Sequence, residues 1–182
     1  MKKTLIFLIA LSAVCACAPK AEEFRILGTV TDPALEGACI YLVPRLEEVI
    51  EPTKENLDST FITEGRFEMH GKVERLSELR IERLRRIGVQ NLLVLTEPGT
   101  INVTIGPASS GGGTPLNDSL QVWKYLTEKY SRDMRLTTDK EVRDSLRVAY
   151  RNRSLRLAAA CGGQIEEFIT GLFPVNSRTP LQ

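Results

Sequence analysis

The sequence predicts a mainly β fold, a seven-stranded antiparallel sandwich or partly open barrel followed by two C-terminal helices. The first observation behind this is a short apolar run at 92–95 and an alternating run at 101–105, separated by a Pro-Gly turn. This pattern predicts a hairpin. The second is Thr114 followed by Pro115, which is typical of an N-cap and the first residue of a helix. We therefore expect the sheet to end there and the helices to begin.

The 182 residues suit one globular domain with appendages, and a formal charge of +1 indicates no nucleic-acid partner. We expect these parts in order: a lipoprotein signal peptide over 1–16, a tether over 17–23, a β-sandwich domain over 24–113, a helical connector over 114–161 and a tail over 162–182.

The amino terminus has the layout of a secretory signal. Two lysines precede an apolar run at 5–11, which is too short to span a bilayer permanently. Val14 and Ala16 stand before Cys17 in a spacing that resembles the lipobox of bacterial lipoproteins. Cys15 fits worse, because Val14 directly before it is large. The resemblance implies that Cys17 receives a diacylglyceryl group and becomes the new N-terminus, whereas a plain secretory signal is the alternative.

Two acidic residues follow the proposed lipid site. Glu22 and Glu23 resemble the surface-export signal of lipoproteins of the Bacteroidota, and a solvated tether explains them equally well. We expect a lipid-anchored protein of the cell envelope, at the outer membrane, and leave open whether it faces the periplasm or the surface.

Five more strands precede the run at 92–95, and the segment 44–54 is expected to be a loop with a helical turn. Glu64 and Gly65 form a two-residue connection of the kind found in tight hairpins. The expected strands are 24–32 paired with 38–43, 57–63 paired with 66–73, and 79–84.

Helical spacing follows residue 114. One helix is expected over 115–130, with Trp123 on its buried face as the main anchor to the sheet. A second is expected over 138–160, ending at a Cys-Gly-Gly sequence, and the tail adds an apolar patch at 168–173. The second helix has an apolar stripe made of Val142, Leu146, Ala149, Tyr150, Leu157 and Ala160.

Four segments carry a family resemblance: FRILGTVTD with GACIYL, DSTFITEGRFEMHGKV, VLTEPGTINVTIG and GTPLND. They resemble a domain of unknown function in Bacteroidota lipoproteins that commonly precedes a thioredoxin-like domain of the peroxiredoxin and thiol-disulfide oxidoreductase type. The resemblance covers about residues 24–126, and its most specific parts are EPGTI and GTPLND. It implies a redox domain with a Cys-x-x-Cys motif, which this sequence lacks, so we expect a stand-alone version or a truncated gene product.

The predicted function is a lipid-anchored, non-catalytic binding or scaffold domain of the bacterial cell envelope. The alternative is a truncated or in-trans accessory domain of a membrane-anchored thiol-disulfide oxidoreductase. The expected partners are the membrane, through Cys17, and an envelope protein or a thioredoxin-like domain. We expect no nucleic acid, no cofactor and no metal.

Three features of the sequence could carry chemistry, and none of them predicts an enzyme. Glu97 lacks a partner at suggestive spacing for acid-base work and is expected to shape a turn. His70, the only histidine, is expected to face solvent from a strand. The glycine-rich segment 109–113 has no following lysine to bind phosphate and is expected to be a flexible connector.

Two thiols remain outside the leader. Cys39 lies in a predicted strand and Cys161 near a helix end. They are expected to be small buried residues, with a disulfide between them as the alternative.

Arginines recur every four residues on the second helix, at Arg143, Arg147 and Arg151. They form either a basic ridge for an anionic surface or a solvated face paired with acids such as Asp139 and Asp144.

Overall fold

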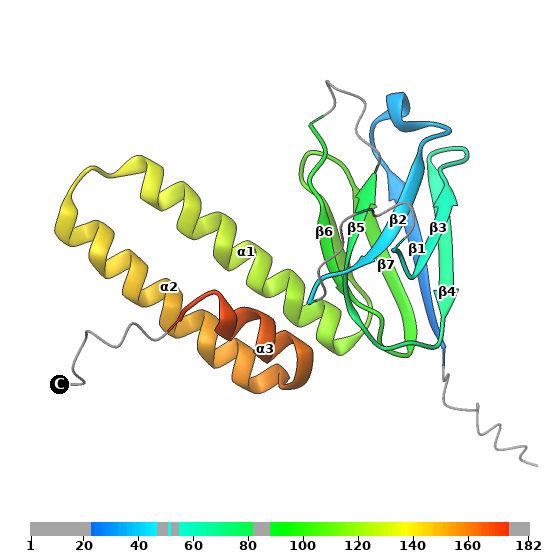
Figure 1. Ribbon diagram of the computed structural model, residues 1–182. Coiled ribbons are helices and arrows are strands. Elements are labelled where there is room, and N and C mark those ends of the chain that lie inside the picture. Colours follow the sequence, from blue (N-terminus) through cyan, green and yellow to red (C-terminus); the bar gives the residue numbers. More distant parts are fainter. Residues whose placement is uncertain (1–22, 47–50, 52–54, 82–87, 175–182) are drawn as a thin grey trace, which may run out of the picture.

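The computed structural model describes residues 23–46, 51, 55–81 and 88–174 (Figure 1). The predictions for the signal peptide, Cys17, most of the tether and the end of the tail lie outside these residues. The elements are β1 (Phe24–Val30), a 3₁₀ turn (Pro33–Leu35), β2 (Cys39–Pro44), β3 (Asp58–Phe61), β4 (Arg66–Gly71), β5 (Leu76–Ile81), β6 (Leu92–Leu95), β7 (Gly99–Ile105), β8 (Ser110–Gly112), α1 (Pro115–Leu136), α2 (Lys140–Cys161) and α3 (Gly163–Gly171).

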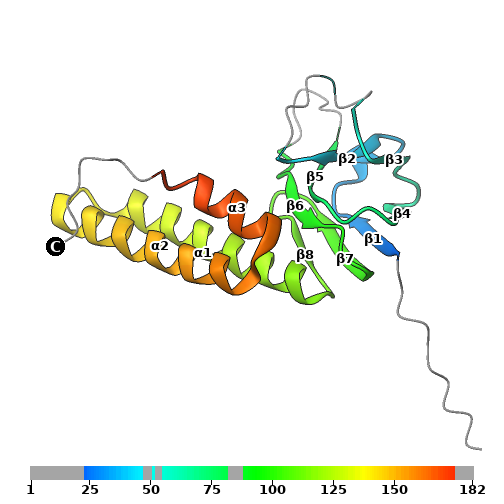
Figure 2. The same cartoon turned by 60° about the horizontal axis from the view of Figure 1, so that its bottom comes forward.

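The strands form two four-stranded sheets. Sheet A has the order β4-β1-β7-β8 and sheet B the order β3-β2-β5-β6, as Figures 1 and 2 show. β1 runs parallel to β7, from Phe24 beside Gly99 to Val30 beside Ile105, while the other pairs are antiparallel. The predicted count of seven strands and the purely antiparallel arrangement are therefore wrong. The described residues hold eight strands in two mixed or antiparallel sheets that do not close into a barrel.

All three predicted hairpins are wrong, although their strands exist. The members of each pair, β1 and β2, β3 and β4, and β6 and β7, belong to different sheets. Alternation with period two shows that one face of a strand is buried, but it does not identify the strand's partner. Each supposed hairpin is a crossing from one sheet to the other.

The turn after β3 has the chemistry that the sequence predicts. Glu64 and Gly65 both have positive φ, 53° and 66°. The backbone N–H of Thr63 donates to the Arg66 carbonyl at 2.9 Å, and that of Arg66 donates back at 3.0 Å. This is a tight primed turn, and the strands that leave it separate into the two sheets.

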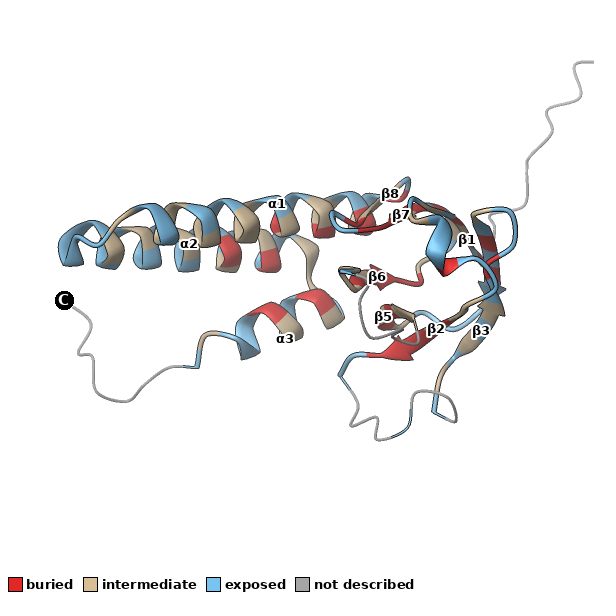
Figure 3. Ribbon diagram, turned by 90° about the horizontal axis from the view of Figure 1, so that it is seen from above, coloured by how far each residue is buried: buried red, intermediate tan, exposed pale blue. Residues whose placement is uncertain are grey.

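One hydrophobic cluster lies between the sheets and joins them (Figure 3). Alternate residues of each strand point into it, because successive side chains of a strand face opposite ways. Its members from sheet A include Ile26, Met69 and Ile101, and those from sheet B include Ile40, Leu42 and Leu79.

The helices build a second cluster at one end of sheet B. The sheet contributes Leu76 and Leu95, and the helices contribute Leu120, Trp123, Ala158, Ile165 and Ile169. Helix α3 was missed, because its segment shows only one apolar patch in the sequence. α1 extends to Leu136, six residues past the predicted end at 130.

α1 and α2 form an antiparallel pair that projects away from the sheets (Figures 1 and 2). Their far turns are exposed in Figure 3. The apolar stripe predicted for α2 is right only in part, because Ala149 and Ala160 are exposed and the buried residues are Ser154 and Ala158. Among the described residues, no helix combines the length and the apolar character needed to cross a membrane.

Candidate functional site

A cleft lies between sheet B and α1, and we call it the β6–α1 cleft. It has a volume of about 230 Å³ and is lined by residues of β6, β8, α1 and α3. β6 and β8 are the edge strands of their sheets, and α1 lies against both (Figure 3). The cleft thus forms where two sheet edges meet a helix.

Two side-chain amides of α1 bind the two sheet edges. The Asn117 Oδ1 accepts from the N–H of Leu95 in β6 at 3.0 Å, and its Nδ2 donates to the Leu95 carbonyl at 2.7 Å. One helical turn later, the Gln121 Oε1 accepts from the N–H of Gly111 in β8 at 2.8 Å. Residues four apart share a helix face, so one face of α1 holds both edges.

Glu97 caps the start of α1. Its Oε1 accepts from the N–H groups of Leu116 at 2.8 Å and Asn117 at 3.1 Å, which have no partner inside the helix. Thr114 is the N-cap residue, as predicted, but its side chain makes no capping bond. Its hydroxyl instead accepts from the Asn117 Nδ2 at 2.8 Å. Glu97 also takes part in a turn, since its backbone N–H donates to the Leu95 carbonyl at 2.8 Å, but its carboxylate has a role that the sequence did not predict, because it is turned toward the helix start.

Two polar atoms in the cleft are buried without a partner in the described part of the chain, the Gln121 Nε2 and the Gln90 Oε1. In each side-chain amide, the other polar atom forms a hydrogen bond that fixes the orientation of the group. The Gln121 Oε1 is held by Gly111, and the Gln90 Nε2 donates to a Glu128 oxygen at 3.4 Å. The cleft therefore presents one unused donor and one unused acceptor to whatever enters it.

Charges of both signs surround the cleft. The Lys124 ammonium, whose side chain is 15% exposed, pairs with Glu128, and Arg80 pairs with Glu78 at 2.7 Å. The hydrogen bond from Lys124 lowers the pKa of the Glu128 carboxyl below its ordinary value of 4.5. The Arg45 guanidinium lies 5.4 Å from the centre of the Phe168 ring. The rim has no excess of either charge.

Trp123 forms the apolar wall. It is 9% exposed and its Nε1 donates to the Ser154 Oγ at 3.3 Å. The Phe168 ring meets it edge-on, with centroids 5.9 Å apart. The predicted burial of Trp123 is confirmed, and its contacts join α1 to α2 and α3 as well as to the end of sheet B.

A family model described as Domain of unknown function (DUF4369) matches residues 24–120. The chain belongs to this family. The DUF4369 match covers both sheets and the start of α1, so it includes Leu93, Glu97 and Asn117 of the site, while Gln121 and Trp123 lie beyond it. No curated protein matches the chain, and no solved structure matches it.

The glycine-rich segment of this DUF4369 protein is ordered, so the predicted flexible connector is wrong. Ser110–Gly112 is β8, paired antiparallel with β7, and the Ser109 Oγ donates to the Gln90 carbonyl at 2.6 Å. The glycines allow close approach. A Cβ on Gly112 would lie 2.6 Å from an Asp118 oxygen, and Gly113 has a φ of 99°. The sequence shows only that the segment lacks side chains, not that other groups need the space.

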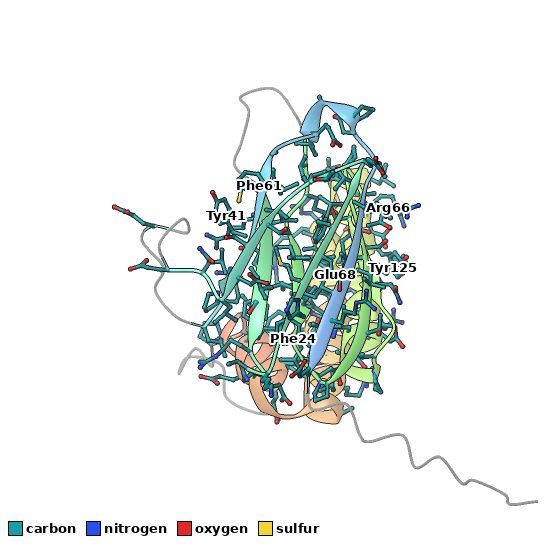
Figure 4. All side chains as sticks on the ribbon, turned by 90° about the vertical axis from the view of Figure 1, so that its right-hand side faces the viewer. Phe24, Tyr41, Phe61, Arg66, Glu68 and Tyr125 are labelled. Carbon is teal, nitrogen blue, oxygen red and sulfur yellow. The ribbon has the colours of Figure 1, made fainter. Side chains whose placement is uncertain are left out.

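His70 is exposed on β4, which confirms its predicted position. It lies beside Arg25 of β1, whose guanidinium pairs with Glu68 at 2.6 Å. Figure 4 views the sheets from the side opposite the helices and labels Glu68. Within the described ranges, no group of three or more His, Cys, Asp or Glu side chains could hold a metal ion.

The two cysteines lie outside the cleft. Cys39 and Cys161 are free and half-buried, so they form no disulfide here.

The arginines of α2 do not form a uniform ridge. The Arg143 Nη1 donates to the carbonyls of Met134 at 2.8 Å and Thr137 at 3.1 Å, which ties α2 to the end of α1. Arg147 pairs with Asp144 at 2.6 Å, as the solvated-face interpretation predicts.

Proposed function

We propose that this DUF4369 protein is a lipid-anchored, non-catalytic binding or scaffold domain of the bacterial cell envelope. The observation that supports binding is the β6–α1 cleft, with its unused donor on Gln121 and unused acceptor on Gln90. Buried polar atoms without partners cost free energy, about 1–3 kcal/mol each. A protein that keeps two of them in one cleft is suited to a ligand that satisfies both.

The use of the nearby charged groups supports a non-catalytic role. Glu97 is occupied by two backbone N–H groups of α1. Lys124 and Glu128 are occupied by each other. A general acid or base needs access to a substrate proton, and these groups are committed to holding the helix and the rim.

The anchor is proposed from the sequence. A lipid at Cys17 would place the domain on the membrane through the short segment before β1, which begins at Phe24. Two or more acyl chains give stable anchoring where a single chain is marginal. We propose the outer membrane of a Bacteroidota cell envelope as the location.

Metabolic labelling with a clickable fatty acid tests the anchor. Cys17→Ala is expected to abolish the label and release the protein from the membrane fraction. Cys15→Ala is the matched control, because it changes a neighbouring thiol that is removed with the signal peptide, and it should keep the label. Undiminished label on Cys17→Ala would contradict lipidation at this residue.

The binding role is tested with the full chain carrying Cys17→Ala, immobilised and exposed to envelope extract. Leu93→Lys places a charge in the cleft and is expected to prevent retention of the bound envelope protein. Val148→Lys, on an exposed position of α2, is the control and should retain it. Equal retention by both variants would show that the cleft is not the binding site.

A second candidate is favoured by exposed apolar side chains on α1. Val122 and Tyr125 are 57% and 59% exposed, and Leu136 near the far end is 80% exposed. Such side chains suit packing against a further folded domain. The chain would then be an accessory domain of a membrane-anchored thiol-disulfide oxidoreductase. Co-purification with a thioredoxin-like protein that Tyr125→Lys abolishes would favour this candidate over the first.

A further inference from the structure

The outer edge of β6 has a backbone position that the helices do not fill. The N–H and carbonyl of Leu95 face α1, where Asn117 binds both, and the next N–H, that of Thr96, donates to the Arg75 carbonyl on the β5 side. Backbone groups of successive strand residues alternate between the two neighbours of a strand. Leu93, two residues before Leu95, therefore directs its N–H and carbonyl away from β5.

The register supports this direction. Leu93 lies opposite Glu78, and Leu95 lies opposite Leu76. The two pairs are two residues apart, so the backbone groups of Leu93 and Leu95 point to the same side of β6 in the β5–β6 ladder. Sheet B ends at β6, so within the described chain no strand pairs with the outer edge at Leu93. Leu93 also lines the cleft.

The protein already shows how amide groups bind this end of the sheet. The Asn117 carboxamide occupies, at Leu95, the place that a peptide group of a neighbouring strand would take. Gln164 does the same on β5, since its Oε1 accepts from the Leu76 N–H at 2.9 Å and its Nε2 donates to the Glu74 carbonyl at 3.2 Å. Leu93 is the next residue along the same edge whose N–H and carbonyl point away from β5, as those of Leu95 do.

The cleft around Leu93 suits one amide and one apolar side chain. Its unused polar atoms are one donor, on Gln121, and one acceptor, on Gln90, and a peptide group offers the complementary acceptor and donor. Its volume of about 230 Å³ is below the roughly 300–1,000 Å³ of a whole drug-sized ligand site. The walls of Trp123 and Phe168 favour an apolar side chain.

From these observations we infer that the β6–α1 cleft binds an extended, uncharged peptide segment of a partner protein, which pairs with the backbone of Leu93 and inserts one apolar side chain toward Trp123. This mode of binding adds a strand to a sheet edge. The carboxylates of Glu78 and Glu128 on the rim are already paired with Arg80 and Lys124, so the rim has no excess charge and favours an uncharged segment. The inference rests on the proposed binding function and names its ligand class.

The probe is the blocked peptide acetyl-Thr-Leu-Thr-Leu-Thr-amide, titrated into the full ¹⁵N-labelled chain carrying Cys17→Ala. We expect a saturable shift of the Leu93 N–H resonance. The paired analogue, N-methylated at the central peptide group, loses one hydrogen bond and should bind about fivefold to tenfold more weakly. A peptide that binds without moving Leu93, or that binds equally well when N-methylated, would overturn the inference.

Substitutions of Leu93 in the protein test the same inference independently of the peptide analogues. Leu93→Pro removes the outward N–H and the leucine side chain, and proline is tolerated on a sheet edge when its nitrogen faces away from the ladder. It is expected to lose the peptide, whereas Leu93→Ala, which keeps the N–H, should still bind it. Equal binding by the two variants would contradict strand addition. One further outcome is that the peptide fails to bind the chain that retains Leu93, while that chain still captures an envelope protein and Leu93→Lys abolishes the capture. That result would overturn the peptide ligand and leave the proposed function in place.

Discussion

The carboxamide of Asn117 forms two hydrogen bonds with the backbone of Leu95, accepting from its N–H at 3.0 Å and donating to its carbonyl at 2.7 Å. Leu76, the register partner of Leu95 in β5, is bound in a similar way by Gln164 of α3. α1 and α3 therefore hold the same end of the β5–β6 ladder through directional bonds. The helices are positioned by these bonds as well as by the second hydrophobic cluster, which fixes the wall of the cleft.

Asn117→Ala should lower the free energy of unfolding by about 1–3 kcal/mol, because it leaves the buried N–H of Leu95 without a partner. The Leu95 carbonyl keeps its second bond, from the Glu97 N–H at 2.8 Å. Asn117 is 2% exposed, so water cannot replace the lost bonds without opening the helix from the sheet. Urea unfolding followed by circular dichroism measures the change. Asn152→Ala, at an exposed position of α2, is the control and should change stability by less than about 0.5 kcal/mol. Equal effects of the two substitutions would contradict this role.

The sequence predicted the strands better than their partners. Alternating residues such as Ile101 and Val103 mark a strand with one buried face, and β7 forms there. The same alternation fits either sheet, so β7 was paired with β6 in the prediction, whereas it pairs with β1 and β8. Pairing is decided by contacts between residues far apart in the chain, such as Phe24 with Gly99, and no local pattern encodes them.

Glu97→Ala should lower the free energy of unfolding by about 1–2 kcal/mol, the range of a lost helix cap. The carboxylate oxygen accepts from two N–H groups at the start of α1, and alanine leaves both unpaired. Glu97→Gln keeps an acceptor oxygen and is expected to cost less than the alanine variant. Thermal unfolding compares them with Glu74→Ala, an exposed control. If Glu97→Ala resembled Glu74→Ala, Glu97 would not be the cap.

The candidate site was only partly visible in the sequence. The segments EPGTI and GTPLND are the most specific parts of the family resemblance, and the bonds from Leu116 and Asn117 to Glu97 join them. Gln90 and Leu93 were missed, because an amide before a strand and an apolar residue inside it look ordinary. One signal was present, since Asn117 and Gln121 are one helical turn apart on the face that adjoins Leu120 and Trp123. Their partners in β6 and β8 are set by the tertiary fold.

The lowered pKa of Glu128 predicts that the stability of the protein depends on pH in the acid range. Its folded pKa is lowered from the ordinary 4.5, mainly by the hydrogen bond from Lys124. A carboxyl with a lowered folded pKa stabilises the protein above its unfolded pKa, and this stabilisation is lost as the pH falls through the folded pKa. The stability difference between wild type and Glu128→Gln should therefore be full above about pH 4.5 and vanish below the folded pKa.

The amplitude should stay below about 1 kcal/mol, because the Glu128 side chain is 41% exposed and water screens the pair. Urea unfolding between pH 3 and pH 7 measures it. The control is the same comparison in a Lys124→Met background, which removes the main cause of the lowered pKa. A pH-dependent difference that persists in that background would rule out the pair as its origin.

Trp123 gives the last prediction, because it is the only tryptophan and reports directly on the helices. Since it is 9% exposed and bonded to Ser154, its emission should be shifted to the blue of free tryptophan and should resist quenching by iodide. Trp123→Ala should cost about 3–5 kcal/mol, as for other buried aromatic side chains. Tyr125→Ala, two residues away and 59% exposed, is the matched control and should cost far less (Figure 4).

Limited proteolysis can also show which part of the protein Trp123→Ala destabilises. The sheets have their own hydrophobic cluster, which does not include Trp123. Limited proteolysis of Trp123→Ala should therefore cut first after Gly113, in the helices, while a fragment of about residues 24–112 resists longer. The fragment is expected to end after β8, because this strand pairs with β7 and belongs to sheet A. Cleavage inside the sheets at the same rate would show that the two clusters unfold as one unit, and emission like that of free tryptophan in the wild type would show that α1 is not docked.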